Sequence, residues 1–380
     1  MKLLAVTATR AEWGLLAPVL DALRGDARFT PQLLATGQHL VAGSTTLAAI
    51  TAEGHQPAAL IDMELGADDG PRAISHSMGV LVDRVGRVFA DLAPDAVLLL
   101  GDRYESLAVA LAALVARIPV VHVFGGDVTE GAFDDSIRHA ITKLAALHFV
   151  SNEESAGRVR QLGEDPARVH NVGSTGIDRI LAVKTLPRDA FFQAVGLRPR
   201  DKNFVLTFHP ATLVDDPVAE ARALLAALDA FPDAGLIFTG SNADPGAREI
   251  DARIQEFVAG RENAVFFESL GSQRYFSALA HCDLVIGNSS SGIMEAPSFN
   301  LPTINIGDRQ ARRMRAQSVI DCAGTPAAIE EAIRSGLALD CSGFTNPYGD
   351  GRAARHIVDI LAKIDNPRSL TRKSFVDVPA

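Results

Sequence analysis

Residues 96–116 have the sequence AVLLLGDRYESLAVALAALVA. The apolar run Ala96–Leu100 leads directly into a polar turn, and the alanine-rich stretch Glu105–Ala116 follows that turn. A short apolar run that ends at a glycine is typical of a strand buried on both faces, and the longer stretch is typical of a helix that covers it. The segment therefore predicts one β-α unit of a parallel sheet.

The same alternation extends from this segment in both directions. In the first half of the chain, we expect further strands at Leu3–Val6, Pro31–Ala35, Val120–Phe124 and His148–Val150. We expect further helices at Glu12–Leu23 and Ser136–Leu147. A polar, proline-containing stretch near residues 183–203 then interrupts the pattern, which indicates a linker.

Beyond the linker the alternation starts again. The strands expected there are Phe204–Thr207, Gly235–Thr239, Val265–Phe267, Leu284–Ile286 and Pro302–Asn305. The helices expected there are Pro217–Ala230, Pro245–Ala259, Ile293–Phe299 and Gly351–Ile364. A chain of 380 residues exceeds the roughly 250–300 residues that one core usually holds, so we predict two α/β domains, 1–182 and 183–350. Ligands of such sheets bind beyond the carboxyl ends of the strands, so we expect a site in the crevice between the domains.

Composition excludes several classes of protein. The net charge of -10 and the absence of any Lys/Arg-rich run argue against a nucleic-acid surface. The three cysteines are far apart and form no CxxC pair, so we expect neither a disulfide framework nor a structural zinc site. The first apolar run is too short for a secretion signal and no apolar run reaches 18 residues, so we expect a cytoplasmic chain without a membrane span.

A serine-rich turn, Asn288–Gly292, follows the expected strand Leu284–Ile286. The small residues Ser289, Ser290, Ser291 and Gly292 at a helix start favour an anion pocket, although a serine cluster that only caps the helix is the alternative. Glu295, which we expect in the first helical turn, either accepts hydrogen bonds from ribose hydroxyls or merely complements the helix dipole.

Candidate residues also follow strands of the first half. Arg10, at the tip of the first β-α loop, either contacts a phosphate or is a solvated surface arginine. Asp102 lies at the carboxyl edge of the sheet, where it is a candidate for chemistry. It also suits the N-cap of the next helix, with Glu105 three residues on, and the two roles can hold together. Farther along, the carboxylates that are dense enough for general acid-base catalysis are Asp127, Glu130, Asp134 and Asp135, unless Asp135 caps a helix after a plain surface loop.

The second half supplies three more loops of this kind. His209 follows the first strand there, although a lone histidine is more often structural. Ser241 and Asn242 follow the next strand, and Arg309 follows the last one, where an arginine suits a phosphate. Loops from both halves fall at the carboxyl ends of strands, and this convergence is stronger evidence than any one loop.

Together these motifs resemble one family, the UDP-N-acetylglucosamine 2-epimerases, and most of all its hydrolysing branch, which opens bacterial sialic- and legionaminic-acid synthesis. The matching segments, in order along the chain, are Thr36–His39, Gly101–Glu105, His122 with Gly125–Asp127, Asp134–Lys143, Phe208–Pro210, Gly240–Asp244, Gly287–Gly292 and Ile304–Gln310. The resemblance implies a glycosyltransferase-B architecture: two Rossmann-like domains around an active-site cleft, with residues 351–380 packing back on the first domain. It also implies a homodimer.

The resemblance further implies a reaction. A base removes the C2 proton of a UDP-linked 2-acetamido sugar while UDP leaves from C1, and water adds to the resulting 2-acetamidoglucal to release the free 2-epimer. Neither a redox cofactor nor a metal is implied.

Roles follow by position in the matching motifs. Arg10 would contact the diphosphate, Ser290, Ser291 and Gly292 would cradle it, and Glu295 would hold the ribose. His209 would face the phosphates or the leaving group, and Asp102, Asp134 and Asp135 match acid-base positions, with Asp127 and Glu130 as further catalytic candidates. The remaining residues expected to bind the UDP-sugar are Gly37, Gln38, His39, Arg103, Arg138, His139, Ser241, Asn242, Ser289 and Arg309.

One position departs from the family pattern: many relatives carry glutamate where this chain has Phe124. Either Asp127 or Glu130 substitutes, or Asp102 with a water suffices, or Phe124 packs against a 6-deoxy sugar. The last option favours UDP-2,4-diacetamido-2,4,6-trideoxyglucose over UDP-N-acetylglucosamine as the substrate. A non-hydrolysing epimerase, a glycosyltransferase and an inactive nucleotide-sugar binder are the competing hypotheses.

Overall fold

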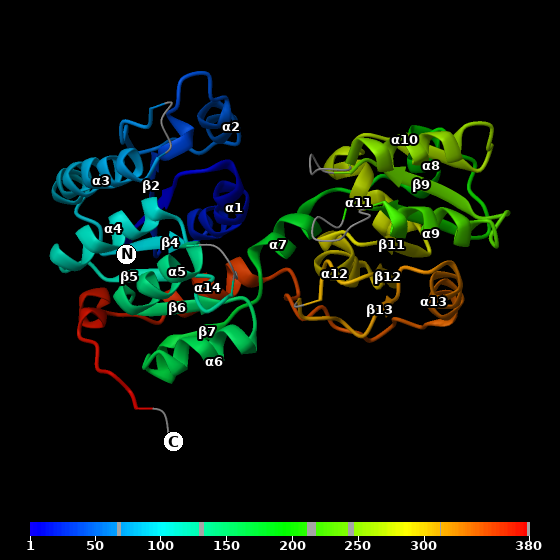
Figure 1. Ribbon diagram of the computed structural model, residues 1–380. Helices are drawn as coiled ribbons and strands as arrows, with labels where there is room; N and C mark the ends of the chain where they lie inside the picture. Colours follow the sequence, from blue (N-terminus) through cyan, green and yellow to red (C-terminus); the bar gives the residue numbers. More distant parts are fainter. Residues whose placement is uncertain (67–69, 129–132, 211–217, 242–246, 312, 378–380) are drawn as a thin grey trace. The chain divides into compact units, whose positions relative to one another are not determined.

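The computed structural model describes all residues except 67–69, 129–132, 211–217, 242–246, 312 and 378–380 (Figure 1). The chain divides into two compact units. The N-terminal unit comprises Met1–Arg179 together with Gly351–Ala380, and the C-terminal unit comprises Ile180–Asp350.

Within the described residues, the N-terminal unit contains a seven-stranded parallel sheet in the order β3-β2-β1-β4-β5-β6-β7. Its strands are β1 Lys2–Thr7, β2 Thr30–Thr36, β3 Ala59–Ile61, β4 Ala96–Leu100, β5 Val120–Val123, β6 Leu147–Val150 and β7 Val169–Asn171. Its helices are α1 Arg10–Arg24, α2 Thr46–Ala52, α3 Pro71–Leu92, α4 Tyr104–Val115, α5 Phe133–Leu144, α6 Glu153–Gln161 and α14 Ala353–Leu361, and α7 Thr175–Ala182 runs across the unit boundary.

Alternate residues of the strands are buried on opposite faces of this sheet. Leu3 and Ala5 of β1 belong to one hydrophobic cluster, whereas Leu4 and Val6 belong to another. Both faces are therefore covered by helices, which explains why the strands are apolar without alternation. The strand order reverses direction between β1 and β4, where Leu3 pairs with Ala96, and this is the point at which open sheets of this type bind ligands.

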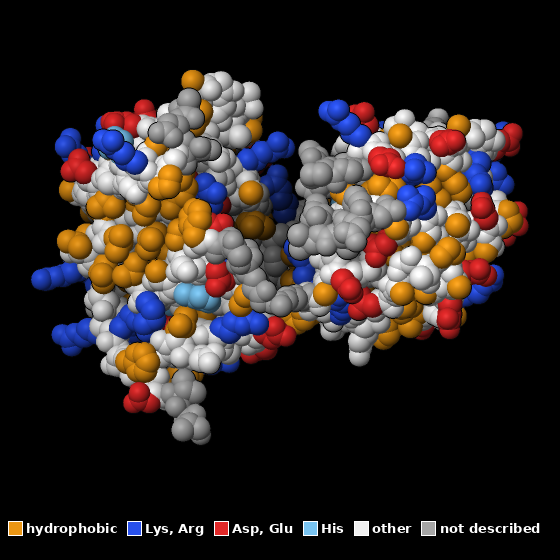
Figure 2. Space-filling model, viewed as in Figure 1, with side chains coloured by type: hydrophobic (Ala, Val, Ile, Leu, Met, Phe, Trp, Pro, Cys, Tyr) orange, Lys and Arg blue, Asp and Glu red, His pale blue; other side chains and the backbone are white. Residues whose placement is uncertain are grey.

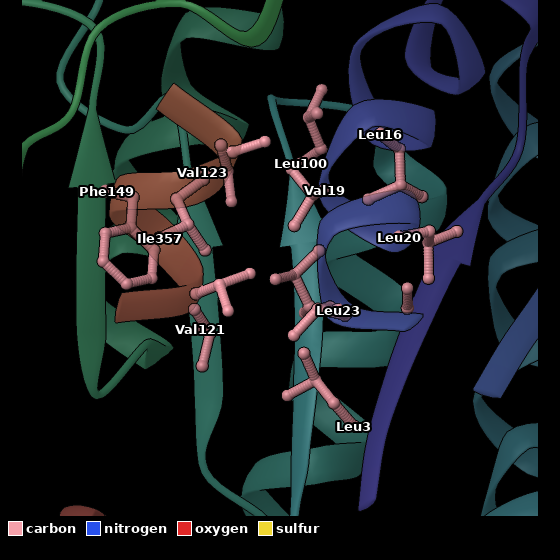
Figure 3. Close-up of a cluster of buried hydrophobic side chains, with 14 of the residues drawn as sticks. Leu3, Leu16, Val19, Leu20, Leu23, Leu100, Val121, Val123, Phe149 and Ile357 are labelled. Atoms are coloured by element: carbon pink, nitrogen blue, oxygen red, sulfur yellow. The ribbon is translucent and has the colours of Figure 1, made fainter. Parts of the chain in front are cut away.

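The helix α14 completes the core of the N-terminal unit although it comes from the end of the chain. Ile357 lies in the same cluster as Leu16 and Leu20 of α1 and Phe149 of β6 (Figure 3). The carboxylate of Asp178 accepts hydrogen bonds from the first amides of α14, Ala353 N at 3.0 Å and Ala354 N at 2.7 Å. This carboxylate satisfies amides that have no partner within the helix.

In the described part of the C-terminal unit, six parallel strands follow the order β10-β9-β8-β11-β12-β13, the strand order of a Rossmann fold. The strands are β8 Asn203–Thr207, β9 Gly235–Thr239, β10 Ala264–Phe267, β11 Leu284–Gly287, β12 Thr303–Ile306 and β13 Val319–Cys322. The helices are α8 Arg188–Ala194, α9 Ala219–Leu228, α10 Ala247–Val258, α11 Gly271–His281, α12 Ser290–Met294 and α13 Pro326–Ala338. Apolar clusters cover both faces of this sheet as well.

The predicted fold class, two Rossmann-like α/β domains, is confirmed by these two sheets. Several strand boundaries differ by one residue from those expected. For example, β5 ends at Val123 rather than Phe124, because Phe124 adopts a left-handed backbone with φ of 66°. The strand expected from His148 starts one residue earlier, at Leu147. Among the helices of the described residues, none combines the length and apolar character needed to cross a bilayer.

We expect Ile357→Ala to destabilise the N-terminal unit by about 2–5 kcal/mol, because it removes a fully buried side chain that packs between α1 and the sheet. Denaturant unfolding followed by the fluorescence of Trp13, the only tryptophan, reports on this unit since Trp13 lies in the same cluster. The control is Arg355→Ala on the exposed face of α14, which should change stability by under about 0.5 kcal/mol. Equal, small effects of both changes would contradict a structural role for α14.

Candidate active site

In the N-terminal unit, the loops after β1, β2 and β4 meet beside one buried carboxylate, Glu12. Its Oε2 accepts hydrogen bonds from Ala8 N at 2.9 Å and from Thr9 N at 3.0 Å, and the Thr9 hydroxyl caps α1 in return. A side chain at Gly37 would crowd both Ala8 and Glu105, at 2.9 and 3.1 Å from its Cβ, and Gly37 has φ of 59°. The loop after β2 therefore requires glycine to approach the first loop this closely.

Glu12 is close enough to a second carboxylate, Glu105, for the two to interact. Burial raises the pKa of Glu12 to about 7, and the negative charge of Glu105 adds to that effect, whereas the amide hydrogen bonds and Arg103 oppose it. Glu105 is 0% exposed and forms two hydrogen bonds of 3.2 Å with Arg103, through Nε and Nη2. Burial lowers the pKa of Arg103 and the pairing with Glu105 raises it, with a net increase.

Asp102 does not cap the helix that follows it, so the predicted capping role was wrong. The helix α4 starts at Tyr104, its N-cap residue is Arg103, and no side chain bonds to the cap. Asp102 instead pairs with Arg138 Nη2. Its side chain is 25% exposed, so it stays accessible at the carboxyl edge of the sheet.

Arg138 connects the carboxylates of this edge. Its guanidinium is 7% exposed and donates to Asp102 through Nη2 and to Asp135 Oδ1 at 3.3 Å through Nη1. Nη1 also donates to the carbonyl oxygen of Asp127 at 2.8 Å. The arginine fork therefore holds both side chains in place through charge-assisted hydrogen bonds.

The other predicted acids lie on different elements. Asp134 is half-buried in the first turn of α5, beside Asp135, and Asp135 also lies 3.6 Å from His139 Nε2. The carboxylate of Asp127 accepts hydrogen bonds from Ser151, at 3.1 Å, and from Ser155, near the start of α6. Glu130 lies outside the described residues.

Two histidines near this edge are held as neutral rings. His122 bonds to the Gly101 carbonyl at 2.7 Å through Nε2, and burial lowers its pKa to about 3. His39 bonds to Thr7 at 3.0 Å and to Thr46 at 2.9 Å, and burial lowers its pKa to about 4. Both therefore position loops rather than carry charge.

Three further residues from the predicted site differ in exposure. Arg10 and Gln38 are exposed. Phe124 is 9% exposed and belongs to the main cluster of the unit, so most of its ring is already covered by protein. A bulky residue with positive φ is a rare conformation, and such residues concentrate at functional sites.

In the C-terminal unit, Asn288 joins the loops after β8 and β11. Its side-chain oxygen accepts from His209 N at 2.7 Å, and its Nδ2 donates to the His209 carbonyl at 2.8 Å. The carbonyl of Asn288 accepts from Gln310 Nε2 at 2.9 Å and from Arg309 Nη1 at 3.3 Å. Because Asn288 is 0% exposed, three predicted loops are fixed around one buried amide at the point where the strand order reverses.

The serine turn begins directly after Gly287. Any Cβ at Gly287 would overlap the Thr207 carbonyl, and its φ is 139°, so only glycine fits there. The Ser289 hydroxyl accepts from Ser291 N at 3.4 Å and caps α12. Gly292 packs tightly on Thr303, which donates to its carbonyl at 2.8 Å.

Glu295 was expected in the first turn of the helix, and this was wrong. It is the C-cap residue of the short helix α12. The Ser291 hydroxyl donates to Glu295 Oε2 and accepts from Tyr275 Oη at 2.6 Å. Burial raises the pKa of Glu295, and the bond from Ser291 partly offsets that effect.

Two predicted residues follow β9, namely Ser241 and Asn242. The Ser241 hydroxyl donates to the Phe208 carbonyl at 2.6 Å, which ties the loop after β9 to the loop after β8. Asn242 lies outside the described residues. Over the ranges that the structure describes, no three or more His, Cys, Asp or Glu side chains are grouped closely enough to hold a metal ion.

The sequence pattern of the UDP-N-acetylglucosamine 2-epimerase family matches residues 21–362. The chain belongs to this family. It is 40% identical over 322 residues, 84% of each chain, to the GDP/UDP-N,N'-diacetylbacillosamine 2-epimerase (hydrolyzing) of Campylobacter jejuni. It is 36% identical over 365 residues, 96% of each chain, to the UDP-N,N'-diacetylbacillosamine 2-epimerase (hydrolyzing) of Legionella pneumophila.

A solved structure supports the fold of this epimerase-family chain. This chain is similar to the UDP-GlcNAc 2-epimerase of Neisseria meningitidis bound to UDP-GlcNAc, with a TM-score of 0.78 and 21% identity. The similarity covers 96% of this chain and 100% of the Neisseria chain.

Two residues that organise these loops, Glu12 and Tyr275, were absent from the predicted set, and Asn288 was named only as part of the serine turn. Asn288 could have been suspected from its place between a strand-ending glycine and the serine turn. Glu12 and Tyr275 carry no such signal, because a glutamate in a first helical turn and a tyrosine in an amphipathic helix are ordinary.

The pKa of Glu12 predicts a pH-dependent stability. Between pH 4.5 and 7 the folded chain retains a proton on Glu12 that the unfolded chain releases, so stability falls as pH rises, by about 3 kcal/mol in total. Glu12→Gln keeps an acceptor for the two amides and removes the titration. We expect this variant to match the wild type near pH 4.5 and to be more stable above pH 7, as measured by Trp13 fluorescence. An exposed change, Glu154→Gln, should leave the pH slope unaltered, and an identical slope in Glu12→Gln would contradict the assignment.

Proposed function

We propose that this chain is a hydrolysing 2-epimerase that converts a UDP-linked 2-acetamido sugar and water into UDP and the free 2-epimer. Family membership supports the reaction class. The observation that carries the proposal is the bridging of Asp102 and Asp135 by Arg138 at the carboxyl edge of the first sheet.

Proton transfer is assigned to the carboxylates of the N-terminal unit. Asp102, paired with Arg138 and partly accessible, takes the proton from C2. The electrons of the C2–H bond form the C1=C2 double bond, and the C1–O bond breaks with its electron pair on UDP. Water then adds across the C1=C2 bond: its oxygen bonds to C1, and its proton passes through Asp134 to the opposite face of C2, which inverts C2 and gives the free sugar. The proton on Asp102 is released to solvent.

Nucleotide binding is assigned to the C-terminal unit. The amides of the serine turn and the Arg309 guanidinium suit a diphosphate, and Glu295 suits the ribose hydroxyls. His209, whose backbone is held by Asn288, is assigned to the departing phosphate, where it would neutralise developing charge.

We favour UDP-2,4-diacetamido-2,4,6-trideoxyglucose over UDP-N-acetylglucosamine as the substrate. The names of the Campylobacter and Legionella relatives support this choice. Phe124 contributes little support, because only 9% of it is exposed. Neither does Asp127 offer a ready replacement for the missing glutamate, since its carboxylate is bonded to Ser151 and Ser155. A place in sialic- or legionaminic-acid synthesis and a cytoplasmic location stay predictions.

We expect the purified chain in deuterated water to release UDP and a free manno-configured sugar that carries one deuterium at C2, detected by mass spectrometry. Asp102→Asn should lower kcat by about 10³-fold, since it removes the proton acceptor, while UDP affinity stays within threefold. Asp91→Asn, which changes an exposed carboxylate on α3, is the control and should retain full activity.

Three other outcomes would favour the competing hypotheses. A UDP-linked product would favour a non-hydrolysing epimerase. UDP release only on addition of an acceptor would favour a glycosyltransferase, and UDP binding without turnover would favour an inactive binder.

The homodimer is also proposed, with support from the surface of the N-terminal unit. Hydrophobic side chains gather on the visible face of this unit (Figure 2), and α4 exposes Leu111, Leu114 and Val115, the last at 84%. The opposite face of α4 is buried, so the helix is apolar all round, which is typical of a helix that is covered on both sides.

We therefore expect the double change Leu114→Asp, Val115→Lys to convert a dimer into a monomer in sedimentation velocity. The control, Lys363→Glu at an exposed position after α14, should leave the sedimentation coefficient unchanged. A wild-type chain that sediments as a monomer at all concentrations would reject the proposal.

A further inference from the structure

A chain of hydroxyl groups runs through the C-terminal unit and ends at Glu295. Thr207 and Thr239, at the carboxyl ends of two neighbouring strands, lie 2.5 Å apart through their Oγ1 atoms. The Thr207 hydroxyl also interacts with Tyr275 and lowers the pKa of its hydroxyl. Tyr275 Oη donates to Ser291 Oγ at 2.6 Å, and Ser291 donates to Glu295 Oε2.

The direction of this chain follows from its last member. The Ser291 hydroxyl donates to Glu295 Oε2, and a hydroxyl has only one hydrogen to give. Ser291 Oγ then accepts from Tyr275, whose own hydrogen is thereby used. Successive donation toward one charged group strengthens each bond, because every hydroxyl is polarised by the next. The Ser291 hydroxyl accordingly has no hydrogen left to give to a phosphate.

Tyr275 is held for this task by its surroundings. It lies on α11, with its ring 5.9 Å from that of Phe276, which in turn stacks on Phe299 at 6.3 Å. Burial raises the pKa of Tyr275 above its usual value, so the hydroxyl stays a donor. A phenylalanine would preserve the ring packing and remove only the hydrogen bond.

We propose that Tyr275 is a positioning residue that acts through Ser291 to hold the Glu295 carboxylate in the orientation that accepts the ribose hydroxyls. The inference rests on the proposed function, which assigns the nucleotide to this unit. Ser291 engages one carboxylate oxygen, Oε2, and so fixes the plane of the group and the direction of the other oxygen. Without Tyr275, Ser291 is free to rotate, and Glu295 loses that fixed orientation.

The test is Tyr275→Phe, measured by calorimetry with UDP and with its 2′- and 3′-deoxy analogues. The wild type should prefer UDP over at least one deoxy analogue by about tenfold, the effect of one hydrogen bond to a charged group. In Tyr275→Phe we expect UDP to bind about tenfold more weakly and that preference to fall to near one. In turnover, KM for the UDP-sugar should rise about tenfold while kcat stays within twofold, since the reacting carbons are not involved.

Two further variants separate positioning from folding. Tyr348→Phe removes a tyrosine hydroxyl elsewhere in the same unit, one that donates to the Met314 carbonyl at 3.2 Å, and should leave the UDP preference intact. Ser291→Ala breaks the chain one step later, and combining it with Tyr275→Phe should weaken UDP binding no more than Ser291→Ala alone.

An unchanged preference for UDP over the deoxy analogues in both Tyr275→Phe and Ser291→Ala overturns the inference, and so does full additivity of the two changes. A wild type that binds UDP without any preference for the ribose hydroxyls overturns it too. A wild type that does not bind UDP at all would instead reject the proposed function.

Discussion

Parallel strands that are buried on both faces leave only their ends for polar side chains. The central strands of both sheets have this constraint, since clusters of apolar side chains cover both faces of each sheet. Polar residues that follow these strands therefore collect at the carboxyl edge. Asp102 follows β4 and Asn288 follows β11, the strands beside β1 and β8 at the two reversals. One burial constraint thus determines where chemistry is located in both units.

At the carboxyl edge of the N-terminal sheet, arginine–carboxylate pairs and burial together determine which side chains carry charge. Arg138 compensates two carboxylates, Asp102 and Asp135, whereas Arg103 compensates Glu105 and leaves Glu12 with a raised pKa. Histidines that look catalytic by their position, His39 and His122, are instead neutral structural groups because burial opposes their protonation. In the C-terminal unit the neutral amide of Asn288 holds the loop in place, because it bonds to both the N–H and the carbonyl of His209.

Much of this arrangement could be predicted from the sequence, because buried parallel strands produce unmistakable apolar runs such as Ala96–Leu100. The three-residue strands β3 and β7 were not expected, since runs of that length carry no pattern, and β13 is too exposed to appear apolar. The 22-residue helix α3 was missed because its arginines, serines and glycines dilute its apolar face. The site was predicted loop by loop, but the orientations of the Asp102 and Glu295 carboxylates depend on partners 36 and 4 residues away, Arg138 and Ser291. Nothing in the local sequence specifies which of several arginines or serines those partners will be.

The contribution of α14 to the first core has a consequence for synthesis on the ribosome. The N-terminal unit needs Ile357 and Val358 to cover one face of its sheet, yet these residues are translated after the whole of the C-terminal unit. The unit translated first is therefore completed last, whereas residues 180–350 are contiguous and have all their strands once they emerge. Until then the nascent N-terminal sheet exposes an apolar surface around Leu16 and Leu20, the kind of surface that chaperones recognise on unfinished chains.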